Sequence, residues 1–451
     1  MTAGMLVRVF VGIILLAVCP LWAQVADSSG AEAAATGPSG NEGAMLTPAP
    51  ISGQGYSMGF TSETRSNYLR GGLMFSTAYD TDATTGTNGQ PISDVSYSIF
   101  PTISLDQTRS RLHWVFNYAP GFTFYQKTSS LNQADQNLGV NLSYRLSPHV
   151  TLSVRDTFLK TSNVLNQPIS DLANPISGGV SVPNNSVIAP LADTLTNNAN
   201  VSITYQFSAN GMVGASGTFT NLHYPKEAQV PGLYDSSSRG GSAFYNHRLS
   251  KMHYIGATYQ YQMFLAYPTV GQSETQTNSI YLFYTVYLKP TLSISVFGGP
   301  QYSNTAQVGL PTMTGWSPAG GASMNWQGKL TSFAASYSRI ISDGGGLSGA
   351  VQSNSANASL HRQLTRTLST IVGASYTSSS VLEAVPTFNT GGNTMLVNAS
   401  VQRQMGEHLT LQLQYTRLHQ SYSDIAAISS NPDRNRAMVS ISYQFSRPLG
   451  R

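Results

Sequence analysis

The sequence predicts an all-β protein, a single transmembrane antiparallel up-and-down β-barrel of about 18 strands, with 16 to 20 as the outer limits. Three observations lead there. Only 10% of the residues are charged, against about 25% in a soluble domain. Beyond residue 23 no apolar run reaches the roughly 20 residues that a membrane-spanning helix needs. Apolar and uncharged polar residues alternate along most of the remaining chain.

The first 23 residues have the layout of a secretory signal peptide. Arg8 precedes an apolar stretch over 9–18, and Ala23 ends a short stretch suited to cleavage. The apolar core is too short to span a bilayer, so a membrane anchor is disfavoured. A lipoprotein signal at Cys19, the single cysteine, is disfavoured because Val18 is not a small residue. We expect export from the cytoplasm and a mature chain without disulfides.

Residues 24–65 are rich in Ala, Gly, Ser and Pro and show no periodicity, which predicts a flexible periplasmic lead-in. From residue 66 the alternation is strict, most clearly in 201–207, 409–415 and 439–445. A period of two places every second side chain on the same face of a strand. We therefore place the barrel at 66–445, followed by a short C-terminal tail at 446–451.

Short and long connections alternate between these strands. The short turns recur at 106–109, 145–149, 207–211, 248–252, 288–290, 326–329, 363–366 and 404–408. Between them lie longer Gly/Asn/Pro-rich stretches at 80–94, 162–198, 224–240 and 304–318. Tight turns at one rim and long loops at the other are typical of outer-membrane barrels. A β-propeller is the alternative, but no blade signature occurs. The last strand is expected at 436–445.

That last strand resembles the terminal assembly signal of bacterial outer-membrane β-barrel proteins, a group that includes porin-like and polysaccharide-export-like barrels. Val439, Ile441, Tyr443 and Phe445 hold its alternate positions, although the family aromatic is usually terminal and here 446–451 follow. The resemblance covers 66–445. It implies location in the cell outer membrane of a Gram-negative-type bacterium, after signal-peptide cleavage. It also implies recognition by the barrel assembly machinery and contact with outer-membrane lipid. Contact with lipopolysaccharide is expected from the carboxylates of the long connections, which divalent cations would bridge to it.

The few charges are sorted by sign along the chain. Carboxylates gather in the long connections, with Asp106 and Glu407 as exceptions. Charge avoids the lipid band and so lies at the rims. A cationic ring at the periplasmic mouth would also raise the local anion concentration. The basic residues at the short turns are Arg109, Arg111, Arg145, Arg248, Lys251, Lys289, Lys329, Arg362, Arg366 and Arg403.

The alternation assigns Tyr281, Phe283, Tyr287 and Arg155 to the lumen. The aromatic rings would stack on sugars, or alternatively pack against a loop folded into the lumen. Elsewhere the inward positions are mainly Ser, Thr, Asn and Gln, which exchange hydrogen bonds with water and with sugar hydroxyls. Such a neutral wall suits polar, largely uncharged solutes.

The connection 162–198 is the longest and carries apolar residues, among them Val180, Val182, Val187 and Ile188. We expect it to constrict or cap the pore, with a surface flap as the alternative.

No motif for a metal, a nucleotide or a nucleophile occurs, and catalysis would need His223 beside Glu227 or Asp235. We therefore expect no enzyme, no catalytic residue, no metal, no cofactor and no nucleic-acid partner. The leading hypothesis is a porin-like channel for polar, largely uncharged solutes, in a narrower form an exporter of a secreted polysaccharide. The alternative is a structural or surface-interaction protein whose loops fill the lumen.

Overall fold

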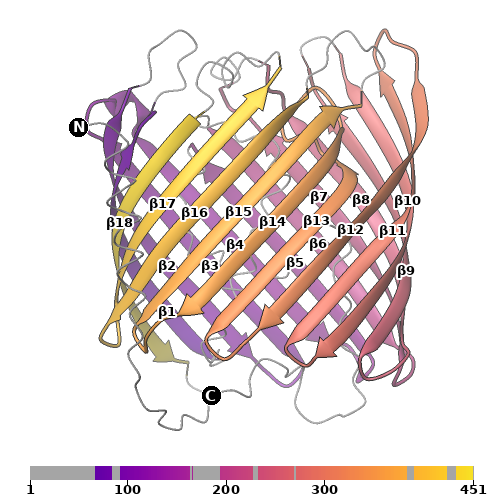
Figure 1. Cartoon of the computed structure of the whole chain (residues 1–451), viewed down its shortest axis with the longest axis horizontal. Helices are drawn as coiled ribbons and strands as arrows, with labels where there is room; N and C mark the ends of the chain where they lie inside the picture. Colours follow the sequence, from indigo (N-terminus) through magenta and orange to yellow (C-terminus); the bar gives the residue numbers. More distant parts are fainter. Residues whose placement is uncertain are drawn as a thin grey trace. The chain divides into compact units, whose positions relative to one another are not determined.

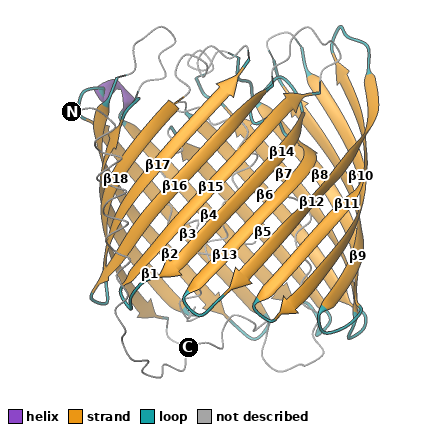
Figure 2. Ribbon diagram, viewed as in Figure 1, coloured by secondary structure: helices purple, strands orange, loops and turns teal. Residues whose placement is uncertain are grey.

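The computed structural model describes residues 67–83, 92–162, 165, 193–226, 232–268, 271–382, 391–423 and 433–449. The expected signal peptide and lead-in, and most of the connection 162–198, lie outside these residues. The described part consists of strands and one short 3₁₀ helix, η1 (Ser129–Leu131) (Figures 1 and 2). The strands are β1 (Tyr68–Asp80), β2 (Asp94–Thr108), β3 (Leu112–Tyr125), β4 (Gln133–Arg145), β5 (Val150–Thr161), β6 (Thr194–Gln206), β7 (Gly211–His223), β8 (Ser236–Arg248), β9 (His253–Ala266), β10 (Ser273–Lys289), β11 (Leu292–Gln307), β12 (Met313–Gln327), β13 (Thr331–Ser342), β14 (Val351–Gln363), β15 (Leu368–Val381), β16 (Gly392–Met405), β17 (Leu409–Tyr422) and β18 (Asp433–Pro448).

These strands form one 18-stranded antiparallel sheet that closes on itself. Each strand pairs with its neighbours in sequence, and β1 pairs with both β2 and β18. The seam between first and last strand runs from Tyr68 opposite Pro448 to Asp80 opposite Arg436. Closure gives the edge strands their partners, which a sheet inside a bilayer requires. The fold class expected from the sequence and the strand number of about 18 are confirmed.

The two ends of the barrel differ in their connections. Tight turns such as 109–111, 290–291 and 406–408 lie at the end where β1 begins and β18 finishes. Gly406 in one of these turns has φ 86°, a conformation that favours glycine. The longer connections, 81–93 and 224–235 among them, join the strands at the opposite end, which we call the outer end. The tight turns appear at the lower end of the view in Figure 2.

The alternation puts apolar side chains outside and polar ones inside. On β18, Val439, Ile441, Tyr443 and Phe445 are 47–50% exposed, whereas Ser440 on the other face is 2% exposed. An exterior of this kind suits lipid rather than water. The resemblance to outer-membrane barrels is therefore confirmed for the fold. No helix within the described residues is long and apolar enough to cross a membrane.

Two details differ from regular expectation. β18 is longer at both ends than the expected 436–445, because β1 begins at Tyr68 and offers partners as far as Pro448, so 446–448 belong to the last strand and not to a tail. The ladder between β12 and β13 is short, running only from Gly320 opposite Arg339 to Gln327 opposite Ser332. Pro318, which has no N–H to donate, lies just beyond its end.

Candidate functional site

The lumen is lined by uncharged polar side chains that hydrogen bond along the wall. On β17 the Gln412 amide donates to Gln414 Oε1 at 3.3 Å, and the Gln414 amide donates to Thr416 Oγ1 at 3.1 Å. On the other side of the barrel, Ser216 and Ser242 of β7 and β8 share a hydrogen bond of 2.8 Å. These contacts join side chains of the wall to one another without fixed charge.

Exposure of the inward side chains changes along the barrel axis. On β18 the inward row runs from buried Arg434 to exposed Gln444 and Ser446. On β14 it runs from buried Ser353 to exposed Ser359. The buried members of both rows lie toward the outer end and the exposed ones toward the tight turns. The lumen is thus accessible from the tight-turn end and filled toward the outer end.

The connection 343–350, between β13 and β14, runs inside the barrel. Just before the connection, at the end of β13, the Ile341 N–H donates to Gln301 Oε1 of β11 at 3.1 Å. The Ser236 hydroxyl of β8 donates to Asp343 Oδ1 at 3.2 Å. Since β8 is not a neighbour of β13 in the sheet, Asp343 reaches it only because the chain leaves the wall after β13.

Apolar packing fixes this connection between opposite walls. Leu347 forms one buried cluster with Tyr224, Leu233, Val351 and Tyr422. Tyr422 ends β17, whereas Tyr224 and Leu233 belong to the connection between β7 and β8, almost opposite in the closed ring. The connection therefore crosses the lumen near its outer end.

A second connection reaches across in the same way. Leu165, which follows β5, packs against Leu418 of β17 and Leu396 of β16. Val180, Val182, Val187 and Ile188 lie outside the described residues. The hypothesis that 162–198 constricts the pore thus remains a prediction, supported by the position of Leu165.

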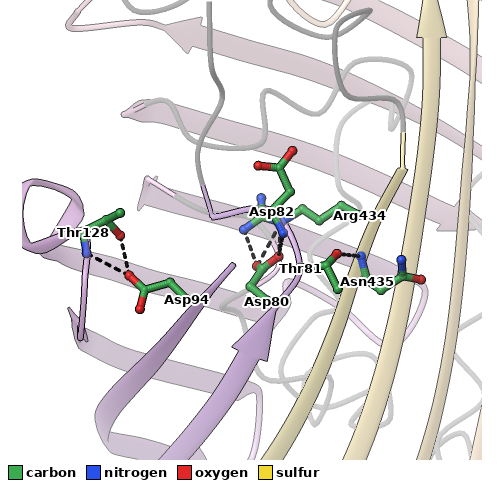
Figure 3. A network of polar contacts seen from close by, with 7 residues as sticks. All are labelled: Asp80, Thr81, Asp82, Asp94, Thr128, Arg434 and Asn435. Atoms are coloured by element: carbon green, nitrogen blue, oxygen red, sulfur yellow. Dashed lines mark hydrogen bonds and ion pairs between the residues drawn. The ribbon is translucent and has the colours of Figure 1, made fainter. Parts of the chain in front are cut away.

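An ion pair joins the first and last strands on the lumenal side, close to the outer end (Figure 3). Arg434 of β18 donates from Nε to both carboxylate oxygens of Asp80 at 2.9 Å, and from Nη2 to Oδ2 at 2.5 Å. Both side chains are buried. Next to the pair, the Asn435 N–H donates to Thr81 Oγ1 at 3.0 Å. The seam is therefore held by side chains as well as by the ladder.

Arg434 and the equally buried Arg436 were not among the residues that sequence reasoning singled out. The inward positions within 439–445 are 440, 442 and 444. Counting back from 440 in steps of two reaches 436 and 434, so both arginines lie on the inward face. With Arg417 and Lys226 they show that the described outer end carries both signs of charge. The separation of charge by sign is therefore incomplete, because buried cations at the outer end balance carboxylates such as Asp80.

The aromatic residues expected in the lumen lie on the inward face of β10 but are packed away. Tyr281 and Phe283 are only 2% and 3% exposed. Tyr281 meets the edge of Phe297 on β11 at 5.6 Å between ring centroids, and Phe283 lies over Gly256 of β9. In this conformation these two rings offer little surface to a solute.

Tyr287 is partly exposed and lies 5.7 Å from Tyr254, ring centroid to ring centroid. Arg155 occupies an inward position of β5 and is partly buried.

The ten basic residues singled out by the sequence all lie at the tight-turn end. The alternation along each strand shows that some of these basic side chains face the lumen and others face the lipid. Arg145 and Arg248 stand at inward positions, and the Arg248 guanidinium lies 5.9 Å from the inward Tyr254 ring. Arg362 and Arg403 stand at lipid-facing positions. Cations at this rim thus face both the mouth and the lipid headgroups.

The structure brings together His223 and Asp235, one of the two pairings considered for catalysis. His223 Nδ1 lies 2.5 Å from Asp235 Oδ2, and Asp235 Oδ1 accepts the Tyr224 N–H at 2.8 Å. These contacts tie the connection after β7 to the start of β8. Glu227 lies outside the described residues. Within the described ranges, no group of three His, Cys, Asp or Glu residues is placed to hold a metal ion.

Comparison with known proteins adds the following. No family model matches the chain, and no curated protein matches it. Among solved structures, OpdK of Pseudomonas aeruginosa with vanillate is 9% identical, with 84% of this chain and 99% of that chain covered at a TM-score of 0.40. OccAB4 of Acinetobacter baumannii is 10% identical, with 85% and 99% covered at 0.40.

The FrpB iron transporter of Neisseria meningitidis is 9% identical, with 83% of this chain and 81% of that chain covered at a TM-score of 0.42. Similarity this low carries no substrate or activity across, so function has to be argued from the lumen itself.

Proposed function

We propose that the protein is a porin-like channel of the outer membrane, closed near its outer end by a movable connection, that passes polar, largely uncharged solutes. The observation that carries this proposal is the connection 343–350, which crosses the lumen between opposite walls. Below it the lumen is polar and accessible from the tight-turn end. A barrel of this strand number encloses an aqueous channel unless chain fills it.

The crossing connection is suited to movement. Its first part contains Gly344, Gly345 and Gly346, and the last two have φ 61° and 101°. Glycine reaches such angles without the steric cost that other residues meet, so this backbone can bend in several ways. Its anchors are a few hydrogen bonds and the side chain of Leu347, while the ladders of the wall stay intact when it moves.

The wall supports the class of solute. Toward the tight-turn end, the inward residues of β6, β16 and β17 are Ser, Thr, Asn and Gln, which exchange hydrogen bonds with hydroxyl-rich molecules. A secreted polysaccharide is the narrower substrate within this class. The buried rings of Tyr281 and Phe283 add no support for it, so it rests on the neutral wall alone.

The proposal includes cleavage of the signal peptide, assembly by the barrel machinery and contact with lipopolysaccharide. Outer-membrane location follows from the apolar exterior together with an export signal. Fractionation that recovers the cleaved chain in the outer membrane, with migration that changes on boiling, is the expected result. Recovery as a soluble periplasmic protein would contradict it.

Planar-bilayer conductance tests the channel. The variant Leu347→Ser removes the apolar anchor, which is 1% exposed, and we expect more frequent and longer openings. The matched control, Leu330→Ser, changes a leucine of a tight turn that is 58% exposed and should behave as wild type. Neutral oligosaccharides should reduce the open current.

A structural or surface-interaction protein with a permanently filled lumen is the second candidate. The buried inward side chains at the outer end favour it. Absence of conductance in both wild type and Leu347→Ser would support this second function and reject the channel.

A further inference from the structure

The outer end of β12 extends beyond its pairing with β13. The ladder between the two strands stops at Gly320 opposite Arg339, whereas β12 continues outward through Met313–Ala319, paired with β11. Residues 313–316 are all exposed, although the alternation points them to opposite faces of the strand. Both faces of this part of β12 are therefore accessible.

Aromatic and amide side chains form a row across the exterior beside this free part. The ladder partners lead from Tyr261 of β9 through Asn278 of β10 and Tyr302 of β11 to Trp316 of β12. Trp316 is 73% exposed, and its ring centroid lies 5.1 Å from that of Tyr302. The row faces outward, because Ile280, on the same face of β10 as Asn278, is 55% exposed.

A second row of outward side chains lies next to the first, toward the outer end, and consists of Gln276, Asn304 and Thr314. Asn278 Oδ1 accepts the Tyr259 hydroxyl at 2.7 Å, and the Gln276 amide donates to Glu274 Oε1 at 2.7 Å. In the part of the chain that the structure describes, the amide N–H groups of Asn278 and Oε1 of Gln276 have no partner. Both amides therefore retain hydrogen-bonding groups for a ligand.

Tyr and Trp are common at both membrane interfaces, so these rings alone do not identify a ligand. The other end of β12 provides a comparison. There Trp326 is 39% exposed and pairs with Leu292, and Met324 pairs with Ile294. Rings among apolar side chains suit lipid. Rings beside amides suit sugars, because the C–H face of a sugar packs on the ring while its hydroxyls exchange hydrogen bonds with the amides.

The aromatic row begins at the lipid band and leads away from it. Ile280 and Leu282, the next outward residues of β10 below Asn278, are 55% and 65% exposed. Since the strands are tilted by roughly 35–45°, a row of ladder partners climbs by about 3 Å from one strand to the next. The climb is toward the outer end, because Met313, the outermost residue of β12, pairs with Thr305 and not with the end of β11. Trp316 therefore lies farthest from the lipid.

We propose that the exterior of β9–β12 at the outer end binds the sugar headgroup of a glycolipid of the outer leaflet. Trp316 and Tyr302 pack on sugar rings, and Asn278 and Gln276 bind their hydroxyls. A lipid-anchored sugar fits better than a soluble one, because the exposed Ile280 beside the row contacts the acyl chains of the same molecule. The inference rests on the outer-membrane location proposed above and gives the contact with lipopolysaccharide a defined site.

The fluorescence of Trp316 tests this site. The chain has four tryptophans. Replacing Trp22, Trp114 and Trp326 by Phe leaves Trp316 as the reporter, and the matched control keeps Trp326 instead. Each chain is reconstituted in phospholipid liposomes with and without rough lipopolysaccharide. Liposomes made from one mixture present the same lipids to both ends of the barrel, so a general interface effect shifts both reporters alike. We expect lipopolysaccharide to shift the emission maximum of Trp316 and to leave that of Trp326 nearly unchanged. Equal shifts, or no shift at Trp316, would overturn the proposal.

Detached core oligosaccharide, added to liposomes without lipopolysaccharide, distinguishes the two sources of sugar. Anchoring in the bilayer raises the effective concentration at the site, so the free oligosaccharide should need about 10-fold more for a half-maximal shift. Equal potency would mean that the surface takes a soluble saccharide and would reject the glycolipid.

Substitutions in the single-Trp316 chain test the row itself. Tyr302→Ala and Asn278→Leu should each reduce the shift several-fold. The second change is the more discriminating, because leucine suits lipid better than an amide does, so a surface that contacts only lipid would tolerate it. The controls Tyr337→Ala and Asn221→Leu alter outward residues near the outer ends of β13 and β7 and should keep the full shift.

Two further measurements separate this site from the channel. Migration that changes on boiling shows that each variant is folded, and bilayer conductance like that of wild type shows that the lumen is unaffected. A full shift in both Tyr302→Ala and Asn278→Leu would show that the sugar does not lie on this row, while unchanged conductance would leave the proposed channel standing.

Discussion

At the scale of the residue, the pair Asp80–Arg434 shows how a barrel holds its closing seam. Both side chains are buried, and the guanidinium contacts both carboxylate oxygens. Desolvating two charges is costly, so such a pair is retained where its geometry is good and where losing one member is worse. The pair joins residues that are 354 positions apart in the chain. It therefore favours one closed arrangement over a slipped seam.

Asp80→Ala should lower the free energy of unfolding of the barrel by about 3 kcal/mol, because it removes the carboxylate that offsets the buried Arg434 charge. Lys226→Ala is the control, since its pair with Asp193 is exposed, 59% at the lysine side chain. That change should cost at most about 1 kcal/mol. The midpoint of unfolding in denaturant, read from migration on unboiled gels, measures both. Equal effects of the two changes would show that the seam does not depend on the ion pair.

The sequence predicts toward which face of a strand a side chain points, but it does not predict how deeply that side chain is buried. Alternation predicts that Tyr281 and Phe283 point inward, because a strand has only two faces. It does not reveal that Phe297 and Gly256 on neighbouring strands provide an edge and a hollow for these rings. Which residues become neighbours across a ladder depends on register, and register is a property of the folded sheet.

At the scale of the element, the connection 343–350 shows that a local sequence pattern can predict a loop without predicting where the loop folds. Three consecutive glycines predict a loop, which is correct, but they do not predict its direction. Inward folding depends on Tyr224 and Tyr422, which are distant in the chain and meet Leu347 only in the closed barrel. The same holds for Leu165, whose partners lie on β16 and β17.

The docking of this connection should depend on pH through Asp343. Burial raises the pKa of the Asp343 carboxyl above its ordinary value, although the Gly345 N–H and the Ser236 hydroxyl oppose the shift. A raised pKa means that the docked state favours the neutral acid. The stabilisation is complete at pH values below the ordinary pKa and is lost as the pH rises through the raised one.

We therefore expect lower conductance in acid than at neutral pH. Asp343→Asn removes the titration while keeping a group of similar shape, and should leave conductance low at both values. Asp433→Asn, at the exposed outer rim, should keep the pH dependence of wild type. Single-channel recording at stepped pH measures all three proteins. A pH response that survives in Asp343→Asn would assign it to another group.

At the scale of the whole molecule, composition and connection lengths were sufficient to predict a closed barrel. Low charge, strict alternation and the succession of short and long connections each reflect a constraint that a bilayer imposes on every strand. The contents of the lumen are under no such constraint. The sequence rule used for charges states only that they avoid the lipid. It therefore did not predict that Arg434 and Arg436 are buried inside the lumen at the outer end.

The basic rim gives the last prediction, because alternation divides it into mouth-facing and lipid-facing cations. Arg145 and Arg248 occupy inward positions at the tight-turn end, and Arg362 and Arg403 occupy outward ones at the same end. A charge near the mouth changes the local ion concentration within roughly 10 Å in 0.1 M salt. Reversing Arg145 and Arg248 to Glu should shift the reversal potential under a salt gradient toward cation preference. Reversing Arg362 and Arg403 places the new charges among lipid headgroups and should shift the reversal potential far less.

The shift caused by reversing Arg145 and Arg248 should shrink in 1 M salt, where screening shortens the range of the charges to about 3 Å. Equal shifts of the reversal potential from both pairs would mean that mouth-facing and lipid-facing cations contribute alike to ion selectivity. If neither pair shifted it, the basic rim would have no part in ion selectivity.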